Sequence, residues 1–301
     1  MPGLATPCLA LLALTGATAA GLSPANQPEP PAGDAAPGLT IQVHPEPIDI
    51  TAIETADDLL VALETADADL ESLTTDVRWA QFFALAGDMQ VRTGTIAYRA
   101  TPSAEGQPPR RAFAITFTEK WVGDRIAPPE RIDYIFDGEW FLERIWSDHQ
   151  AFKRQVVPPG RIADPLRIGE GPFPIPVGQR REEILSRFEA ELVDPIESID
   201  DRLVSFVEAG DGTWCLSLTP HPHLLEDTTW RRIRVWYSKA DLTPILAWTI
   251  NAAEDESYIQ LINVERGAEV EDAAFDTSML DDEDWTVHRT FWQESAGGGG
   301  Q

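Results

Sequence analysis

The sequence predicts an α+β protein built around one antiparallel sheet that has an apolar face to cover. A series of β-rich segments follows Asp211, separated by turn residues and with no helix between the later ones. Apolar residues fall at every second position in these segments, as in Trp214, Leu216 and Leu218, so each strand has a hydrophobic face and a more polar one. A segment with helical spacing at residues 56–73 offers a cover for the hydrophobic face.

The composition is that of a folded protein with a sizeable core. The chain has 301 residues, of which 43% are hydrophobic and 24% charged. Its formal net charge of -27 argues against nucleic acid or an anionic membrane as a partner, because both would be repelled by the surface. The nearest basic patch is Arg231, Arg232 and Arg234. It falls in a predicted strand where Arg232 and Arg234 share the polar face, which we interpret as solvated.

The amino terminus is typical of a secretory signal peptide, which we place at residues 1–19. Leu9 to Leu14 form a short apolar run, and Ala17-Thr18-Ala19 matches the small-x-small cleavage pattern. The usual basic residue ahead of the apolar run is missing, so an alanine-rich start without export stays open as the alternative. Pro7 and the few apolar residues ahead of Cys8 argue against a lipidated cysteine.

Three further parts follow the signal peptide. Residues 20–50 are rich in Pro and Ala and are expected to form a disordered tether. Residues 51–280 form the predicted domain, and residues 281–301 an acidic and Gly-rich tail in which Trp285 and Phe291-Trp292 are the residues suited to dock on the domain. With the leader removed, Cys215 is the only cysteine, so no intramolecular disulfide is available, and we expect a packed thiol.

The first half of the domain is expected to be one helix and a run of strands. Thr55 or Asp57 can cap the helix, whose apolar residues Leu59, Leu60, Leu63, Ala66, Leu70 and Leu73 recur at helical spacing. The predicted strands are Val77 to Leu85, Gln90 to Ala100, Arg111 to Val122, Arg131 to Asp137 and Glu139 to Ile145. Asp137-Gly138 between the last two is a hairpin signal.

A segment of different character runs from Val156 to Glu191. It is irregular through its Pro and Gly content, and residues 181–192 then have helical spacing through Ile184, Leu185, Phe188 and Leu192. A long loop with a helix between two sets of strands is where a lid would lie, and long loops of this kind are often functional. A plain packing role stays open.

The residue types of common catalytic and metal sites do not assemble into motifs. His221-Pro222-His223 is the only close pair among the five histidines, and a metal site would need further ligands. No Gly-rich phosphate loop, Gly-x-Ser-x-Gly elbow or His-Glu-x-x-His pattern is present. We therefore expect no metal, no cofactor and no enzymatic activity, and an envelope hydrolase has no motif behind it.

Aromatic residues are the remaining unusual feature. Ten Trp and twelve Phe supply a large apolar area, much of it at alternating strand positions. They can fill an ordinary core between sheet and helices. Alternatively, a curved sheet with only two helices to cover it leaves an apolar cavity that suits an acyl chain.

The order of these elements resembles the periplasmic outer-membrane lipoprotein carriers, the LolA-like family, over residues 56–279. The resemblance rests on the opening helix that leads into Val77 to Phe83 and on a set of short pieces that keep the family's order. These pieces are Gly94-Thr-Ile-Ala-Tyr-Arg followed by Phe113, Phe136-Asp-Gly-Glu-Trp-Phe-Leu, Leu218-Thr-Pro, Asp241-Leu-Thr-Pro-Ile and Val270-Glu-Asp-Ala-Ala-Phe275.

The resemblance implies an unclosed antiparallel β-barrel, a curved half-barrel sheet with helices forming a lid over the concave apolar face. The expected lipid-cavity residues are Trp79, Ile96, Tyr98, Phe113, Ile115, Phe117, Tyr134, Phe136 and Trp140. The expected lid or entrance residues are Leu63, Leu70, Phe173, Ile175 and Phe188. A family arginine that latches the lid should fall near Arg99, although the register places Ala100 there.

By the same resemblance, the function is periplasmic binding and transport of lipoprotein acyl chains, or of another lipid, towards the outer membrane. The implied partners are an inner-membrane releasing complex and an outer-membrane acceptor, with the chain acting as a monomer and without nucleic acid. The alternative is a periplasmic sensor or interaction module that keeps the fold with a filled core and carries no cargo.

Overall fold

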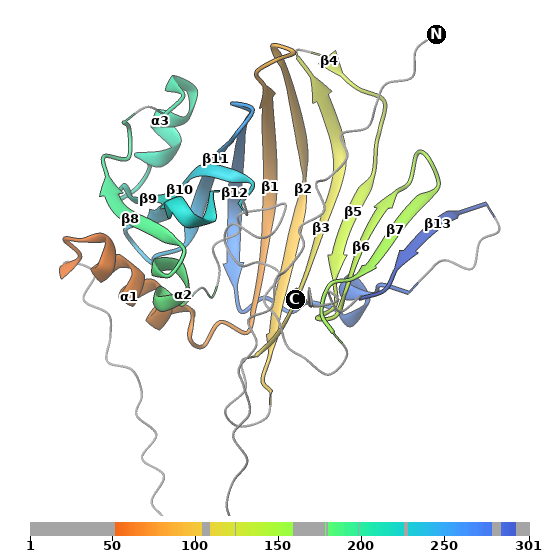
Figure 1. Cartoon of the computed structure of the whole chain (residues 1–301), viewed down its shortest axis with the longest axis horizontal. Coiled ribbons are helices and arrows are strands. Elements are labelled where there is room, and N and C mark those ends of the chain that lie inside the picture. The colour runs from red at the N-terminus through yellow and green to blue at the C-terminus, as the bar shows by residue number, and fades with distance from the viewer. Residues whose placement is uncertain are drawn as a thin grey trace, which may run out of the picture. The chain divides into compact units, whose positions relative to one another are not determined.

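A computed structural model describes residues 52–103, 109–123, 125–158, 178, 180–197, 199–225, 228–278 and 284–292. All of them belong to one unit of the chain, Ile48–Gln293. A single large sheet dominates this unit, and three short helices lie near its β8 to β12 end (Figure 1). Phe173 and Ile175, which were expected to form the entrance, lie outside the described residues.

The elements alternate little between helix and strand. The helices are α1 (Ala56–Asp67), α2 (Arg181–Leu185) and α3 (Asp201–Val207), with 3-10 helices η2 (Pro222–Leu224) and η3 (Asp272–Phe275). The strands are β1 (Ser72–Phe83), β2 (Asp88–Thr101), β3 (Arg110–Val122), β4 (Arg125–Ile126), β5 (Ile132–Phe136), β6 (Trp140–Ile145), β7 (Gln150–Gln155), β8 (Phe188–Val193), β9 (Thr213–Pro220), β10 (Trp230–Ser238), β11 (Pro244–Asn251), β12 (Glu256–Arg266) and β13 (Thr286–Thr290).

Within the described residues, all the strands belong to one sheet of 13 strands. Its order is β13-β7-β6-β5-β3-β2-β1-β12-β11-β10-β9-β8, with β4 attached to β3. Neighbours pair antiparallel except β13, which lies parallel to β7. The two ends of this order, β13 and β8, do not pair with each other, so the sheet is open. The prediction of an α+β fold with an unclosed antiparallel sheet is confirmed.

The two faces of the sheet carry different covers. We call the face that packs against α1 and α2 the inner face; its residues, among them Phe113 and Leu216, form the main hydrophobic cluster with Leu59 and Ile184 of the two helices. The outer face has two smaller clusters. One lies under α3 and includes Cys215 and Trp236, and the other lies under residues of the carboxy-terminal segment, including Phe275.

Helix α1 begins as predicted but ends earlier. Thr55 is its N-cap: the Thr55 hydroxyl accepts from the Asp58 amide at 3.2 Å, and the Asp58 carboxylate accepts from the Thr55 amide at 2.9 Å. This capping box satisfies two of the free amides at the helix start. The helix ends at Asp67, so Leu70 follows it and Leu73 belongs to β1. Leu73 fits the helical spacing and equally the alternation of β1, where it pairs with Tyr98.

The prediction of a helix at residues 181–192 was wrong for the second half of that segment. Only Arg181–Leu185 is helical, and Phe188–Val193 is strand β8, paired with β9 from Phe188↔Pro220 to Val193↔Cys215. Phe188 and Leu192 are four residues apart, which suits a helix, but they also share one face of a strand because the interval is even. Pairing with β9 decides in favour of the strand.

The strand predictions in the first half of the domain are confirmed to within a few residues at most ends. The hairpin at Asp137-Gly138 joins β5 to β6, and Gly138 has φ of 103° there, a conformation that favours glycine. The prediction that Arg232 and Arg234 lie on a solvated face was wrong for Arg234. Arg234 is 6% exposed and donates to the Glu197 carbonyl, because residues 194–197 lie over this part of the outer face.

Candidate functional site

An aromatic cluster on the inner face is built by strand register. Tyr98, Phe113, Phe136 and Phe141 are successive partners across β2, β3, β5 and β6. The next row across the same strands is Ile96, Ile115 and Tyr134. Since facing residues in an antiparallel sheet point to the same side, the rows gather their rings on one face.

The rings of this cluster are in direct contact. The centroid distance is 5.5 Å between Trp79 and Phe117, 6.3 Å between Phe117 and Tyr134, and 6.2 Å between Tyr134 and Phe141. Phe113 lies 6.3 Å from Phe141. These distances are those of favourable aromatic pairs. The result is a continuous aromatic surface that reaches from β1 to β6.

Most of the residues expected to line a lipid cavity lie in the main hydrophobic cluster of the inner face. These are Ile96, Tyr98, Phe113, Ile115, Phe117, Tyr134 and Phe136, each no more than 8% exposed, with the half-buried Trp79 packed against them.

Trp140 lies on the other side of the sheet. Its ring contacts Phe291 at 5.5 Å, and the Lys153 ammonium lies 5.0 Å from its centroid. Its neighbour Phe141 takes the inner position, because Phe141 is the residue that faces Phe136 across the hairpin. Phe141 is the aromatic residue that the sequence prediction missed.

The expected lid residues reach the same cluster from different elements. Leu63 in α1, Leu70 after the end of α1 and Phe188 in β8 are all buried in it. Helix α1 therefore packs on the inner face at the β8 end of the sheet (Figure 1).

Arg99, the expected lid latch, lies on the outer face. Its guanidinium pairs with Asp272 at 2.5 Å and lies 4.7 Å from the centroid of Phe275, both in η3. Tyr98, the preceding residue, points to the inner face, so alternation along β2 sends Arg99 away from α1.

Two other arginines connect the sheet to the end of α1. Arg266 of β12 donates to the Asp67 carboxylate at 2.9 Å and to the Ala66 carbonyl at 2.7 Å. The Gly178 amide donates to the same carboxylate at 2.8 Å, and Arg111 of β3 donates to the Gly178 carbonyl. We call Asp67, Arg111, Gly178 and Arg266 the helix anchor. It holds the carboxy-terminal end of α1 against the sheet.

Burial dominates the electrostatics of the helix anchor. The Asp67 side chain is 10% exposed, and its burial raises the pKa of that carboxyl, against the Gly178 amide and Arg266, which favour the charged form. The ion pair by itself therefore contributes little stability, but removing one partner leaves the other groups unpaired.

We expect Asp67→Ala to lower the free energy of unfolding by about 2 kcal/mol, below the range for a fully buried pair, because Arg266 is 27% exposed. Asp57→Ala is the matched control at the other end of α1. Both side chains of its ion pair with Arg181 are partly exposed. Loss of this pair should therefore lower the free energy of unfolding by less than about 1 kcal/mol. Urea unfolding of both variants checks this, and equal losses would contradict the assignment of the anchor.

The Asp67→Asn variant tests the pKa of this group. Because the pKa of Asp67 is higher in the folded chain than in the unfolded chain, the folded state binds the proton more tightly. The stability from this group is therefore fully present below the unfolded pKa and is lost as the pH rises through the folded pKa. Asparagine cannot ionise, so the difference in unfolding free energy between wild type and Asp67→Asn should change over that window.

Polar side chains border the aromatic cluster. Tyr134 and Glu143 are hydrogen-bonded to each other and face each other across β5 and β6. Burial raises the pKa of Glu143, while Arg154, Tyr134 and Arg92 favour its charged form. Arg92 also pairs with Glu130 at 3.5 Å. A ligand on the inner face would meet both apolar rings and these ionisable groups.

The described residues contain no group of three or more His, Cys, Asp or Glu side chains placed to hold a metal ion. His221 and His223 stack with centroids 5.8 Å apart, and His221 Nε2 lies 3.0 Å from the Leu185 carbonyl. Cys215 is 1% exposed, and burial raises the pKa of its thiol to about 12. Such a thiol is inert, as the packed cysteine predicted from the sequence should be. In the part of the chain that the structure describes, no helix is both long and apolar enough to span a membrane.

No protein-family model and no curated protein matches the chain. Solved structures that align with it include an uncharacterized conserved protein from Thermus thermophilus, with 10% identity and a TM-score of 0.42, covering 78% of this chain and 98% of that one. LolA superfamily protein NE2245 from Nitrosomonas europaea has 11% identity and a TM-score of 0.32, covering 75% and 99%.

MucB in its complex with MucA from Pseudomonas aeruginosa has 15% identity and a TM-score of 0.36, covering 74% of this chain and 61% of that one. The aligned structures thus include LolA superfamily proteins, the family that the sequence resembles. Similarities at these identities and TM-scores give this chain no function by themselves, so its function has to be argued from its own residues.

Proposed function

We propose that this protein binds the acyl chains of a lipid or lipoprotein on its inner face and carries them through the periplasm towards the outer membrane. The observation that carries the proposal is the aromatic surface from Trp79 to Phe141, which belongs to the same hydrophobic cluster as the buried residues of α1. An acyl chain that left water for such a surface would gain about 0.8 kcal/mol per methylene.

Uptake requires the inner face to open. The aromatic rings contact one another in the structure, so an acyl chain must separate these contacts before it binds. The helix anchor restrains α1 at one end, and because burial raises the pKa of Asp67, its ion pair contributes little net stability. A carrier needs such a cover, because it must also release its cargo.

The proposed carrier acts as a monomer without a cofactor and has no catalytic residue. It would receive its cargo from a releasing complex of the inner membrane and deliver it to an acceptor at the outer membrane. The signal peptide at residues 1–19 belongs to the same proposal, since a periplasmic carrier must be exported.

The direct contacts among the rings favour a second candidate function, in which the inner face binds no cargo. A sheet whose inner face is already filled needs no cargo, and the protein would then be a periplasmic sensor or interaction module. Native mass spectrometry of protein purified from the cell envelope separates the two. A bound lipid mass supports the carrier, and a clean apo mass favours the module.

Adjacent residues on opposite faces of β6 give a direct test of the site. Phe141→Gln places an amide on the proposed acyl surface, whereas Trp140→Gln makes the same change on the outer face. We expect Phe141→Gln to weaken binding of a fluorescent fatty acid about tenfold, because the amide loses water without gaining a partner.

Trp140→Gln should bind the fatty acid like the wild type. Circular dichroism at the assay temperature establishes that both variants are folded. Equal affinities of the two variants would show that the inner face is not the binding surface.

A further inference from the structure

A pocket on the outer face, on the opposite side of the sheet from the proposed acyl site, is built by two rows of facing residues. Thr95, Thr116, Asp133 and Arg144 are successive partners across β2, β3, β5 and β6. The adjacent row is Ala97, Ala114 and Ile135. The alanines leave space between the sheet and residues 273–278, and the resulting cavity has a volume of about 250 Å³.

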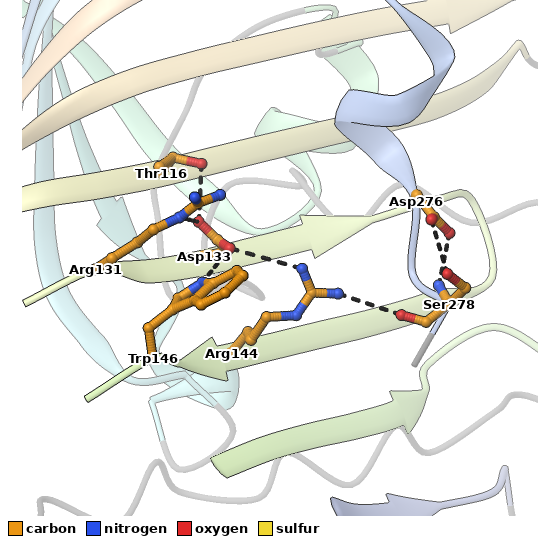
Figure 2. A network of polar contacts seen from close by, with 7 residues as sticks. All are labelled: Thr116, Arg131, Asp133, Arg144, Trp146, Asp276 and Ser278. Atoms are coloured by element: carbon orange, nitrogen blue, oxygen red, sulfur yellow. Dashed lines mark hydrogen bonds and ion pairs between the residues drawn. The ribbon is translucent and has the colours of Figure 1, made fainter. Parts of the chain in front are cut away.

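Charged side chains line this pocket, and Figure 2 shows the polar network to which they belong. The Asp133 side chain is 1% exposed and accepts from Thr116 Oγ1 at 3.1 Å, Arg131 Nε at 3.0 Å and Trp146 Nε1 at 2.7 Å. Arg144 Nη1 lies 3.8 Å from the same carboxylate, and Arg144 Nη2 donates to the Ser278 carbonyl at 3.2 Å. Asp133 is thus fully occupied, and it fixes both guanidinium groups in place.

Both arginines have donor nitrogens that make no hydrogen bond within the described residues. Arg144 is 9% exposed, and its buried Nε has no partner among the described residues. Arg131 uses its Nε on Asp133 and stacks on Trp146 with its guanidinium 4.5 Å from the ring centroid. Within the described part of the chain its terminal nitrogens make no hydrogen bond, and half of the side chain is exposed. A buried donor without a partner costs free energy unless a ligand or solvent satisfies it.

The rim of the pocket carries a negative charge. Asp276 is exposed, and its carboxylate accepts from the Ser278 amide and hydroxyl, each at 2.7 Å. These hydrogen bonds hold the pKa of Asp276 below its usual value, so the group is anionic at neutral pH. A carboxylate has about four acceptor sites, so Asp276 can accept further bonds from a ligand.

We propose that this pocket binds a small zwitterion, with its anionic group on Arg131 and Arg144 and its amine on Asp276. The formal charges of the two arginines and of the two aspartates in the wall and rim cancel, so a ligand with a net charge would bury that charge without compensation. A zwitterion satisfies the donors and the acceptor together, and a short apolar body fits over Ala97 and Ala114. At roughly 30 Å³ for each water-sized group, the volume suits a ligand of about eight non-hydrogen atoms.

Two sources offer this chemistry at the right size: a free amino acid and the phosphoethanolamine group of a lipid. Calorimetric titration of the full chain with L-valine and with the methyl ester of phosphoethanolamine, which keeps the single negative charge of the lipid phosphodiester, distinguishes them, since the natural source should bind more tightly. Isovalerate and isobutylamine, which each keep one charge of valine, should bind about tenfold more weakly or not at all, because one wall of the pocket is left unpaired.

Two variants localise the binding. Ala97→Leu fills the pocket without removing a charge and should abolish binding, while a circular dichroism spectrum like that of the wild type establishes that the variant is folded. Arg131→Gln should weaken binding about tenfold. Arg231→Gln, which alters an exposed arginine paired with Glu254 outside the pocket, should leave it unchanged.

Failure of both zwitterions to bind would overturn the proposal. It would equally be overturned if Ala97→Leu bound them as the wild type does, or if isovalerate bound as tightly as L-valine. None of these outcomes depends on whether the inner face binds acyl chains.

Discussion

Asp133→Ala is expected to lower the free energy of unfolding by about 4 kcal/mol, because it leaves buried charge without a partner. The carboxylate is 1% exposed and serves Thr116, Arg131 and Trp146 as their acceptor. Arg144, whose side chain is 10% exposed, would then keep only the Ser278 carbonyl. Burial already lowers the pKa of Arg144 against the attraction of Asp133, so without that carboxylate nothing compensates the desolvation of the guanidinium.

Guanidinium chloride unfolding measures the loss, and two further variants identify its cause. Asp272→Ala removes an ion pair on the same face, but Asp272 is 92% exposed, so this control should cost less than about 1 kcal/mol. Adding Arg144→Met to Asp133→Ala removes the unpaired charge and should recover part of the stability. A loss for Asp133→Ala no larger than that for Asp272→Ala would show that the network is not a buried unit.

The strands that build the inner face were predictable because alternation is a local property. Phe113, Ile115 and Phe117 share a face whatever the rest of the fold does, and they lie together in the main cluster. The capping box at Thr55 and the turn at Asp137-Gly138 are local for the same reason.

Trp140 shows how a local pattern can be followed to the wrong face. The family resemblance placed this ring among the lipid-cavity residues together with Tyr134 and Phe136. In a hairpin, however, the residue that faces Phe136 fixes the side for the whole second strand, and that residue is Phe141. Carrying the alternation across the turn would have selected Phe141 from the sequence.

The ends of helices were harder to predict, because the deciding contacts are distant. Phe188 belongs to a strand because it pairs with Pro220, and no spacing within residues 181–192 contains that information. The helix anchor is similar: the hydrogen bond from Arg266 to Asp67 joins residues 199 apart in sequence. The latch was expected near Arg99, although the register placed Ala100 there, and the direction of the Arg99 side chain is set by alternation along β2.

Gly94→Ala is expected to lower the free energy of unfolding by about 3 kcal/mol or more, because an added methyl group has no room. A Cβ at this position would lie 1.9 Å from the Thr116 carbonyl oxygen and 2.8 Å from the Phe117 Cα. Both are backbone atoms of β3, so relief would require β2 and β3 to separate beneath the aromatic cluster. The register shift between Thr93 and Gly94 places the glycine opposite Phe117, which explains the close approach.

Gly87→Ala is the matched control for this substitution. Gly87 lies in the turn between β1 and β2 with φ of 62° and nothing within 4 Å of its added Cβ, so the change should cost only about 1 kcal/mol of backbone strain. Urea unfolding measures the free energy of unfolding of both variants. If the Gly94→Ala chain fails to fold while the Gly87→Ala chain folds, the prediction is also confirmed. Because Phe117 packs on Trp79 at 5.5 Å, any Gly94 variant that does fold should also bind the fluorescent fatty acid more weakly. Equal stability of the two variants would mean that β2 and β3 tolerate a wider separation at this point, and the aromatic rows of the inner face would then not be fixed by Gly94.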